Sequence, residues 1–325
     1  MLTAYVFDRE RGEEVEDWSG SRAGLSDDQV LWVDLLHPSE EEEQAARDGL
    51  GLAAVAEDAE SDATKAAAVE LGDEFIRVTA VAVSDDEQDP ERELVLVECV
   101  IGPNWVLTSH REQVAVIDDF RGLAAGGGGL GVLDAPSFLA TLLEWVVTSY
   151  SRAFAEIEAT LEAFDVEVLK TAKGETEKQI AVLVKTRSRV GRLRRALSPH
   201  REIFATLAHS ELDAISSDQS AEKFQKLTQQ VDAALATARD AKDAVVSSFD
   251  VLILRTEHRT NEIMKILTLA SILLLPGALI AGVMGMNVNF KPSAFVQSIV
   301  FWIATAAIVG IALITLGFAR RRHWI

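Results

Sequence analysis

The spacing of hydrophobic residues along the chain changes near residue 136. Before that point, short runs rich in β-branched residues stand between polar turns, and they predict strands over residues 30–35, 75–83, 93–101 and 105–109. Ser39 is followed by a row of glutamates, which predicts a helix that begins there with the serine as its N-cap. Residues 1–135 are therefore predicted to form a domain of mixed α and β structure.

From residue 136 to 220, apolar residues recur three and four positions apart, which is the period of an amphipathic helix. The pattern predicts one long helix from Ser137 to Val168 and a second from about Glu175 to Leu197, and Pro199 begins the next. The second helix carries a basic run that we interpret as a solvated face paired with acidic surroundings: Lys185, Arg187, Arg189, Arg192, Arg194 and Arg195.

A longer helix is predicted to follow, because no proline or glycine interrupts the chain from Ala221 to Leu275. Residues 221–265 form its stalk, with an apolar stripe typical of an interhelical seam: Phe224, Leu227, Val231, Leu235, Ala238, Val245, Phe249, Leu252 and Thr256. A second face runs along the same helix without a break, and we expect it to face a central axis: Asp250, Glu257, Asn261, Met264, Leu267, Ser271, Leu275, Ala278 and Gly282.

Two C-terminal segments are predicted to cross a membrane. Residues 266–286 and 293–319 contain no charged residue, and each is long enough as a helix to span the ~30 Å hydrocarbon core. The basic tail at 320–325 includes Arg320, Arg321 and Arg322, which the positive-inside rule places in the cytoplasm. Two spans then place the long N-terminal region there too, and only the loop 287–292 lies outside.

Charge and composition narrow the possible functions. The chain has 51 acidic and 31 basic side chains and a net charge of −20, so we expect no nucleic-acid partner. Five basic residues and one acid lie from Asn261 onward, which leaves −24 on the first 260 residues. The single cysteine, Cys99, is predicted to be a small buried hydrophobe. The loop Gly126–Gly129 lacks the lysine and hydroxyl of a phosphate-binding loop.

A short motif closes the first predicted span. Gly285-Met286-Asn287 at this place resembles the signature of the CorA family of divalent-cation channels. The strand Trp32–Leu35, the helix pattern after Pro136 and the basic tail also resemble that family, so the resemblance covers nearly the whole chain.

This resemblance implies an α+β fold in a funnel-shaped homopentamer. Each chain would supply an α/β/α cytosolic domain, a stalk helix that becomes the pore-lining span, and an outer second span. The protein would sit in the cell's inner membrane with both termini in the cytoplasm. It would have no prosthetic group, and Mg²⁺, with Co²⁺ and Ni²⁺ tolerated, would be its substrate.

The resemblance also implies roles for particular residues. Gly285, Met286 and Asn287 would be the selectivity motif, with Asn287 in a ring around the hydrated ion. The residues from Asn261 to Gly282 on the second face would line the pore and its gate, and Asp250 and Glu257 would be acids below it. Mg²⁺ would also regulate the channel by binding acidic surfaces between cytosolic domains, for which Glu40–Glu43, Asp58/Glu60/Asp62 and Asp85–Glu91 are candidates.

The chemistry of these residues agrees with such a role. Mg²⁺ gives up its water reluctantly, so a pore should hydrogen-bond the hydrated ion, as an amide oxygen of Asn287 can. Rings of Met264, Leu267 and Leu275 would form an apolar constriction that gates by dewetting. Pro276 removes one helix hydrogen bond and is predicted to kink the span.

The chain departs from the family pattern at several positions. Met284 and Val288 stand where aromatic residues are usual, and Ala278 replaces a polar residue of the pore face. The outer loop has no acid and carries Lys291, whose charge would repel cations.

Two alternatives remain open beside a Mg²⁺ channel. A ZntB-like protein would move Zn²⁺ with a proton gradient and would need a titratable group on the path. A membrane-anchored cation sensor would have the same fold and no flux. An enzyme is not predicted, because the sequence shows no nucleophile elbow, phosphate loop or metal-ligand histidine pair.

Overall fold

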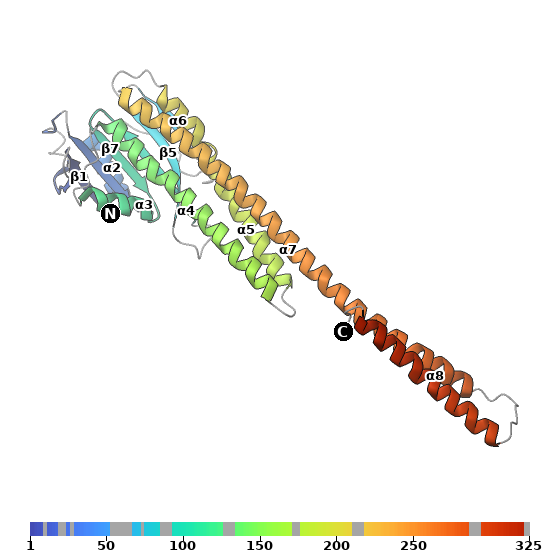
Figure 1. Ribbon diagram of the computed structural model, residues 1–325. Helices are drawn as coiled ribbons and strands as arrows, with labels where there is room; N and C mark the ends of the chain where they lie inside the picture. Colours follow the sequence, from blue (N-terminus) through green and yellow to red (C-terminus); the bar gives the residue numbers. More distant parts are fainter. Residues whose placement is uncertain are drawn as a thin grey trace. The chain divides into compact units, whose positions relative to one another are not determined.

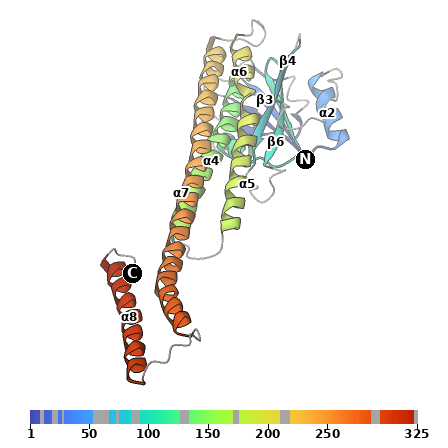
Figure 2. The ribbon, with the colours of Figure 1, turned by 90° about the vertical axis from the view of Figure 1, so that its right-hand side faces the viewer.

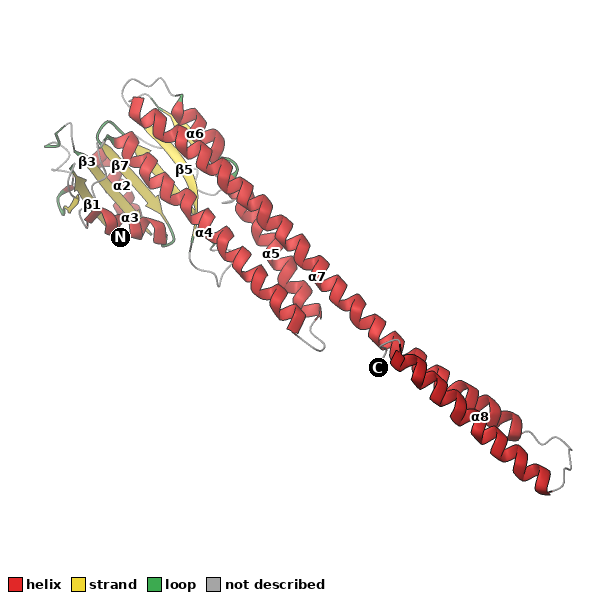
Figure 3. Ribbon diagram, in the orientation of Figure 1, coloured by secondary structure: helices red, strands yellow, loops and turns green. Residues whose placement is uncertain are grey.

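The computed structural model describes residues 1–8, 12–18, 24–26, 29–52, 67–72, 75–84, 93–125, 134–170, 176–209, 218–285 and 294–321. The chain divides into two compact units, Met1–Phe249 and Asp250–Ile325. Unit 1 combines a mixed β-sheet with helices, and unit 2 consists of long helices (Figures 1 and 3). The α+β fold class predicted from the sequence is confirmed.

Unit 1 contains a sheet of seven strands in the order β2-β1-β3-β7-β6-β5-β4. Their bounds are β1 Leu2–Phe7, β2 Gly12–Glu14, β3 Val30–Leu36, β4 Ala68–Leu71, β5 Ile76–Val83, β6 Leu94–Ile101 and β7 Trp105–His110. Only the central pair β3 and β7 runs parallel, and the other neighbours are antiparallel. The four predicted strands are β3, β5, β6 and β7.

The sequence pattern did not predict the strands β1, β2 and β4, nor the helix α3, Ala115–Ala125. β2 and β4 have three and four residues, which is too short for a period to show. β1 buries residues on both faces because it pairs with β3 inside the sheet, so it lacks a clean alternation. The predicted turn at 85–90 and the glycine loop at 126–129 lie outside the described residues.

The two faces of β3 explain how the sheet is covered. Leu31, Val33 and Leu35 pack on one face with Ala46 and Leu50 of α2, Glu40–Leu50. Trp32 points to the other face, where its ring meets those of Tyr5, Phe7, Phe120 and Phe138 from β1, α3 and α4. Figure 2 shows α2 on one side of the sheet and α4 on the other. The strand is therefore apolar at successive positions, because both faces are buried.

The N-terminus of α2 has the predicted cap. The Glu42 N–H donates to Ser39 Oγ over 3.2 Å, and the Ser39 N–H donates back to the Glu42 carboxylate over 3.0 Å. This capping box satisfies two backbone donors at the helix start. The left-handed Gly51, with φ of 72°, ends the helix.

Side chains of the helices cover part of the exposed edge of β5. β4 pairs with β5 only from Ile76 to Thr79, so β5 continues beyond its partner. There the Val81 N–H donates to His200 Nε2 over 3.0 Å, and the Tyr150 hydroxyl donates to the Val81 carbonyl over 2.8 Å. The Val83 N–H donates to Ser149 Oγ over 3.1 Å. The backbone groups of this edge are thereby satisfied.

Long helices complete unit 1. They are α4, Ala135–Lys170, α5, Thr176–Leu197, α6, His200–Ala208, and the first part of α7, which as a whole covers Asp218–Gly285. In unit 1, α7 buries a strict three-four repeat: Phe224, Leu227, Val231, Ala234, Ala238, Ala241, Val245 and Ser248. Leu235 and Phe249, which the sequence pattern assigned to this seam, are half-buried because they fall outside the strict repeat.

The basic run of α5 is only partly paired. Arg189 and Arg192 both bind the carboxylate of Glu93, which is 3% exposed, and Arg189 also lies 3.7 Å from Glu156. A buried carboxylate needs such partners, so these two arginines attach α5 to the start of β6. The other four, Lys185, Arg187, Arg194 and Arg195, are exposed, as predicted for a solvated face. Among the described residues they have no acidic partner within 4 Å, so the prediction of paired charges fails for them.

Unit 2 contains α7 from Asp250 onward and α8, Ala294–Arg321. α7 is one uninterrupted helix through Pro276. Both helices are long and apolar enough to cross a membrane. The placement of the N-terminal region and the basic tail in the cytosol, and of the loop 287–292 outside, remains a prediction.

Candidate ion pathway

One face of α7 in unit 2 is open along its whole length. All nine residues predicted to face a central axis, from Asp250 to Gly282, are exposed in the single chain. Among them are three large apolar side chains: Met264 is 53%, Leu267 58% and Leu275 68% exposed. Large apolar side chains in a row without cover indicate a surface that other molecules cover.

The opposite face of α7 lies against α8. The half-buried residues of α7 in this region are Lys265, Leu269, Leu273, Pro276, Gly277 and Ile280. A Cβ built on Gly277 would lie 3.6 Å from Cγ2 of Ile308 in α8, which is ordinary contact. At about 100° per residue, this set is centred nearly opposite the set from Asn261 to Gly282. α8 therefore covers one side of α7 and leaves the predicted pathway face free.

The signature motif begins at the end of α7. Gly285 is the last residue of the helix, and Met286 and Asn287 lie outside the described residues. A Cβ built on Gly282 or Gly285 would meet nothing within 4 Å in the single chain. The glycines thus leave open space on the pathway face, where a neighbouring helix could approach closely. The loop with Val288 and Lys291 and the side chain of Met284 also lie outside the described residues.

Hydroxyl groups on this part of α7 are satisfied within the helix. Ser271 Oγ donates to the Leu267 carbonyl over 2.9 Å, and Thr268 Oγ1 donates to the Met264 carbonyl over 2.7 Å. Such bonds allow polar side chains to lie in an apolar segment. Ser271 can still accept a hydrogen bond from water on the exposed face.

Charged residues flank the apolar part of the pathway. Asp250 and Glu257 are exposed on the pathway face. His258 Nδ1 lies 3.7 Å from Glu262 Oε1, and both side chains are well exposed. His258 follows Glu257 by one residue, so it points about 100° away around the helix and off the pathway face. At the end of α8, Arg320 and Arg321 are exposed, and Arg322 lies outside the described residues.

The acidic clusters proposed as cation sensors can be placed only in part. Glu42 serves the capping box and also binds the N-terminal amine over 3.1 Å, and these hydrogen bonds hold the pKa of Glu42 below its ordinary value. Glu43 lies 3.8 Å from Arg47. The clusters at 58–62 and 85–91 lie outside the described residues. Within the described part of the chain, no three His, Cys, Asp or Glu side chains are placed to hold a metal ion.

A buried polar network in unit 1 was not recognised from the sequence. Asp34 on β3 is fully buried and accepts a hydrogen bond from Thr108 Oγ1 over 2.5 Å and one from Arg121 Nη2 over 2.5 Å. His110 Nε2 lies 3.3 Å from the same carboxylate. The signal was present in Val33-Asp34-Leu35, because an acid inside an apolar strand needs a buried partner.

The pKa values in this network are shifted in opposite directions. Burial alone would raise the pKa of Asp34, but contact with His110, the Thr108 hydrogen bond and the Arg121 charge lower it overall. Burial alone would lower the pKa of His110, but contact with Asp34 and the carbonyl of Glu112, 2.7 Å from Nδ1, raise it overall. The network therefore favours a carboxylate beside an imidazolium. By contrast, burial raises the pKa of Cys99, which remains a buried thiol as predicted.

Comparison with known proteins decides the family. The family described as "CorA-like Mg2+ transporter protein" matches residues 27–321. The chain belongs to the CorA family. As a member of this family, the protein is a divalent-cation membrane transporter and not an enzyme. The apolar parts of α7 and α8 are its membrane-spanning helices.

Two relatives match this CorA family member over most of its length. The "Cobalt/magnesium transport protein CorA" of Methanocaldococcus jannaschii is 24% identical over 308 residues, which cover 93% of each chain. The "Divalent cation transporter CmaX" of Pseudomonas aeruginosa is 26% identical over 304 residues, which cover 93% of this chain and 89% of the relative.

Solved structures support the CorA-like fold. The complete CorA magnesium transporter of M. jannaschii superposes with a TM-score of 0.79, at 21% identity, over 100% of this chain and 99% of the other. The full-length CmaX protein gives a TM-score of 0.72, at 21% identity, over 99% and 97% of the two chains. The ZntB cytoplasmic domain of Vibrio parahaemolyticus gives a TM-score of 0.58, at 12% identity, over 79% of this chain and 98% of the other, so that domain shares the fold.

Proposed function

We propose that this chain forms a homopentamer in the cell's inner membrane and lets Mg²⁺ enter the cytosol along the central axis, with Co²⁺ and Ni²⁺ as further substrates. The exposed face of α7, from Asp250 to Gly282, is the observation that carries the proposal. Family membership supports divalent cations as the cargo.

The need for several chains follows from the two spans. Two helices enclose no pore, so a conducting path requires copies of α7 around an axis. The face opposite α8 has no cover in one chain, and five copies would bring their faces together there. Both termini would lie in the cytoplasm, because the arginines after α8 stay on that side.

Selectivity would arise at the outer end of α7. Mg²⁺ is held in proteins with several waters still attached, so the ring of Asn287 amide oxygens would accept hydrogen bonds from the water shell. The open space at Gly282 and Gly285 supports close approach of the helices beside this ring.

The gate would lie deeper in the span. Met264, Leu267 and Leu275 share the pathway face, and rings of them would narrow the path and exclude water when closed. Ser271 would place a polar group between the rings of Leu267 and Leu275, and Asn261 would place one before the ring of Met264. Asp250 and Glu257 would attract the ion as it leaves toward the cytosol.

No fuel is required for entry. A membrane potential of 100 mV contributes about 2.3 kcal/mol per elementary charge, so about 4.6 kcal/mol for a divalent ion that moves inward. Closure would follow when intracellular Mg²⁺ binds between acidic surfaces of neighbouring cytosolic domains. The net charge of −20 supports this, because bound cations would relieve the repulsion between chains.

The test is uptake into proteoliposomes with an inside-negative potential, measured with a Mg²⁺ dye and a Zn²⁺ dye, with and without a pH gradient. We expect Mg²⁺ entry driven by potential alone. Zn²⁺ entry that requires the pH gradient would instead assign the ZntB-like mechanism, and no flux of either ion would assign a cation sensor.

Asn287→Ala should abolish selective Mg²⁺ flux because the ring then offers no amide oxygen to the water shell. Asn289→Ala is the matched control, since it removes the same group two residues away and should leave flux nearly unchanged. Native mass spectrometry should give pentamers for both variants. Unchanged Mg²⁺ uptake by Asn287→Ala would remove this residue from the mechanism.

A further inference from the structure

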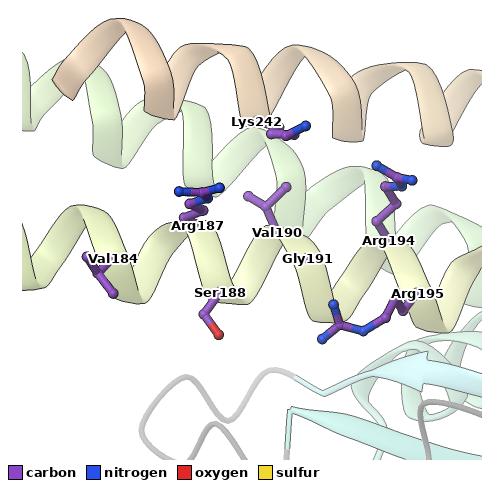
Figure 4. Close-up of a pocket in the computed structure, with 8 residues that line it drawn as sticks. All are labelled: Val184, Arg187, Ser188, Val190, Gly191, Arg194, Arg195 and Lys242. Carbon is purple, nitrogen blue, oxygen red and sulfur yellow. The ribbon is translucent and has the colours of Figure 1, made fainter. Parts of the chain in front are cut away.

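A hollow lies on α5 in unit 1, beside α7. It has a volume of about 410 Å³ and is lined by Val184, Arg187, Ser188, Val190, Gly191, Arg194, Arg195 and Lys242. Figure 4 shows Arg187 and Arg194 on the side of α5 where Lys242 reaches in from α7. The volume is in the range of small-molecule sites.

The charge of the hollow contrasts with that of the chain. Four of its eight lining residues are cationic and none is acidic, whereas the whole chain carries −20. Arg189 and Arg192 on the same helix are held by Glu93, but the described residues offer no acid within 4 Å to Arg187, Arg194, Arg195 or Lys242. Four like charges around one hollow repel each other, and an anion between them would remove that repulsion.

Gly191 forms the floor of the hollow. A Cβ built there would meet only Nη1 of Arg195, at 3.4 Å, so the guanidinium of Arg195 lies over the glycine. Glycine is disfavoured inside a helix, and here its missing side chain is what leaves room between the arginines. The hollow is thus shaped by the residue at its centre as well as by the cations around it.

The spacing of the cations suits an extended anion. Arg187 and Arg194 are two turns apart on α5, which is about 10 Å along the helix axis. At this spacing, each of the two arginines can bind a different phosphate of one chain of phosphates. Arginine suits this ligand because its planar fork binds phosphate oxygens in pairs.

We propose that this hollow binds a soluble anion with a chain of phosphates, such as a nucleoside triphosphate or an inorganic triphosphate. Arg187 and Arg194 would hold the two ends of the chain, Lys242 would bind from α7, and Ser188 would donate its hydroxyl. The ligand would join α5 to the same helix that carries the pathway face, so its binding would connect the cell's phosphate pool to the stalk helix.

The experiment measures binding rather than transport, so it stands apart from the proposed function. The full-length protein in zwitterionic-lipid nanodiscs is titrated with inorganic tripolyphosphate and with ATP by calorimetry, in buffer freed of divalent cations. We expect saturable binding of one anion per chain. Tighter binding of ATP would assign a nucleotide, and equal binding would assign the phosphate chain alone.

Variants separate the hollow from general electrostatics. Arg194→Gln should weaken binding by about tenfold, since a hydrogen bond to a charged group is lost. Arg194→Lys keeps the charge but loses the planar guanidinium, so its affinity should lie between those of the unchanged protein and Arg194→Gln. Lys185→Gln is the matched control, because it removes one charge from an exposed position of α5 outside the hollow. Gly191→Leu keeps every charge and fills the floor, and should abolish binding.

Several results would overturn the proposal. Equal losses in Lys185→Gln and Arg194→Gln would mean diffuse attraction, and full binding by Gly191→Leu would remove the hollow as the site. If citrate binds as tightly as tripolyphosphate, the hollow recognises negative charge and does not select phosphate groups. If tripolyphosphate binds in zwitterionic nanodiscs but not in phosphatidylglycerol nanodiscs, lipid headgroups are the occupant of the hollow. Unchanged affinity for tripolyphosphate in phosphatidylglycerol nanodiscs supports the soluble ligand.

Discussion

The two units use the same apolar residue types in opposite ways. In unit 1, Trp32 is fully buried among four aromatic rings, whereas in unit 2 Trp302 on α8 is 66% exposed. Unit 1 has a sheet and helices that cover each other, and unit 2 has two helices that leave most of their surface open. The difference teaches that unit 1 buries its apolar residues within its own chain, while unit 2 leaves apolar side chains open for the membrane to cover.

The same contrast separates the two faces of α7. In unit 1 its repeat from Phe224 to Ser248 is buried against its own domain, and Gln230 of α7 donates to Glu144 of α4 over 2.7 Å. In unit 2, from Asn261 onward, the half-buried residues of α7 lie on the face toward α8. One helix thus serves a packed core along one part and offers an open face along the other.

The strongest test of this contrast replaces one tryptophan in each unit. Trp32→Ala should lower the stability of unit 1 by about 4 kcal/mol, because a large cavity opens and Thr108 loses a donor 2.9 Å away. Trp302→Ala is the matched control and should leave unit 1 unchanged. Hydrogen exchange by mass spectrometry on the full-length protein reads both units separately. An equal loss of hydrogen-exchange protection in unit 1 for both variants would contradict this contrast between the two units.

The buried Asp34 network should give the next largest effect. Asp34→Asn leaves His110 and Arg121 facing an uncharged amide, and breaking a buried ion pair from one side destabilises by about 3 kcal/mol. Protection of β3 and β7 amides should fall in hydrogen exchange. Glu257→Gln, which removes an exposed acid in unit 2, should not change that protection.

The same network predicts a dependence on pH. The raised pKa of His110 means that its contribution is fully present below the ordinary value of 6.5 and is lost as the pH rises through the folded-state pKa. The lowered pKa of Asp34 means that its contribution is present above the ordinary 3.8 and is lost as the pH falls through the folded-state pKa. His110→Gln should remove the alkaline loss of unit 1 stability in urea unfolding, whereas exposed His258→Gln should preserve it.

A smaller effect is expected on the open face of α7. In the proposed pentamer, Leu275→Ser would make one ring of the closed gate polar, so leak of Mg²⁺ at high internal Mg²⁺ should rise by about tenfold, or about 1.4 kcal/mol. Ile266→Ser is the control, since Ile266 is 69% exposed but points about 180° away from Leu275. Proteoliposome flux provides the measurement. A larger leak in the control would place the pathway on another face.

The smallest effect concerns a surface contact of unit 1. Ser39→Ala removes half of the capping box and should destabilise α2 by about 1 kcal/mol. Thr160→Ala is matched, because its hydroxyl donates to the Glu156 carbonyl within α4 and caps no helix end. Local hydrogen exchange of α2 should rise only in the first variant. No change would mean that packing of Ala46 and Leu50 alone holds the helix.

Sequence alone determined the elements whose pattern is local and long. The three-four spacing gave α4, α5 and α7, the uncharged runs gave both spans, and Ser39 gave a helix start that the capping box confirms. The motif at Gly285 led to the family, which the comparisons confirm. These predictions succeed because the helix period, the helix cap and the length of a membrane span depend on residues that are neighbours in the chain.

Only the tertiary structure decided which faces meet. The strands β1, β2 and β4 depend on pairing with distant segments. Asp34, Thr108 and His110 come together because β3 and β7 are parallel neighbours, and α3 adds Arg121 to them. The division of the α5 arginines into paired and unpaired groups also required the position of Glu93. Contacts between residues far apart in sequence leave no period to detect, so burial and partner choice follow from the fold.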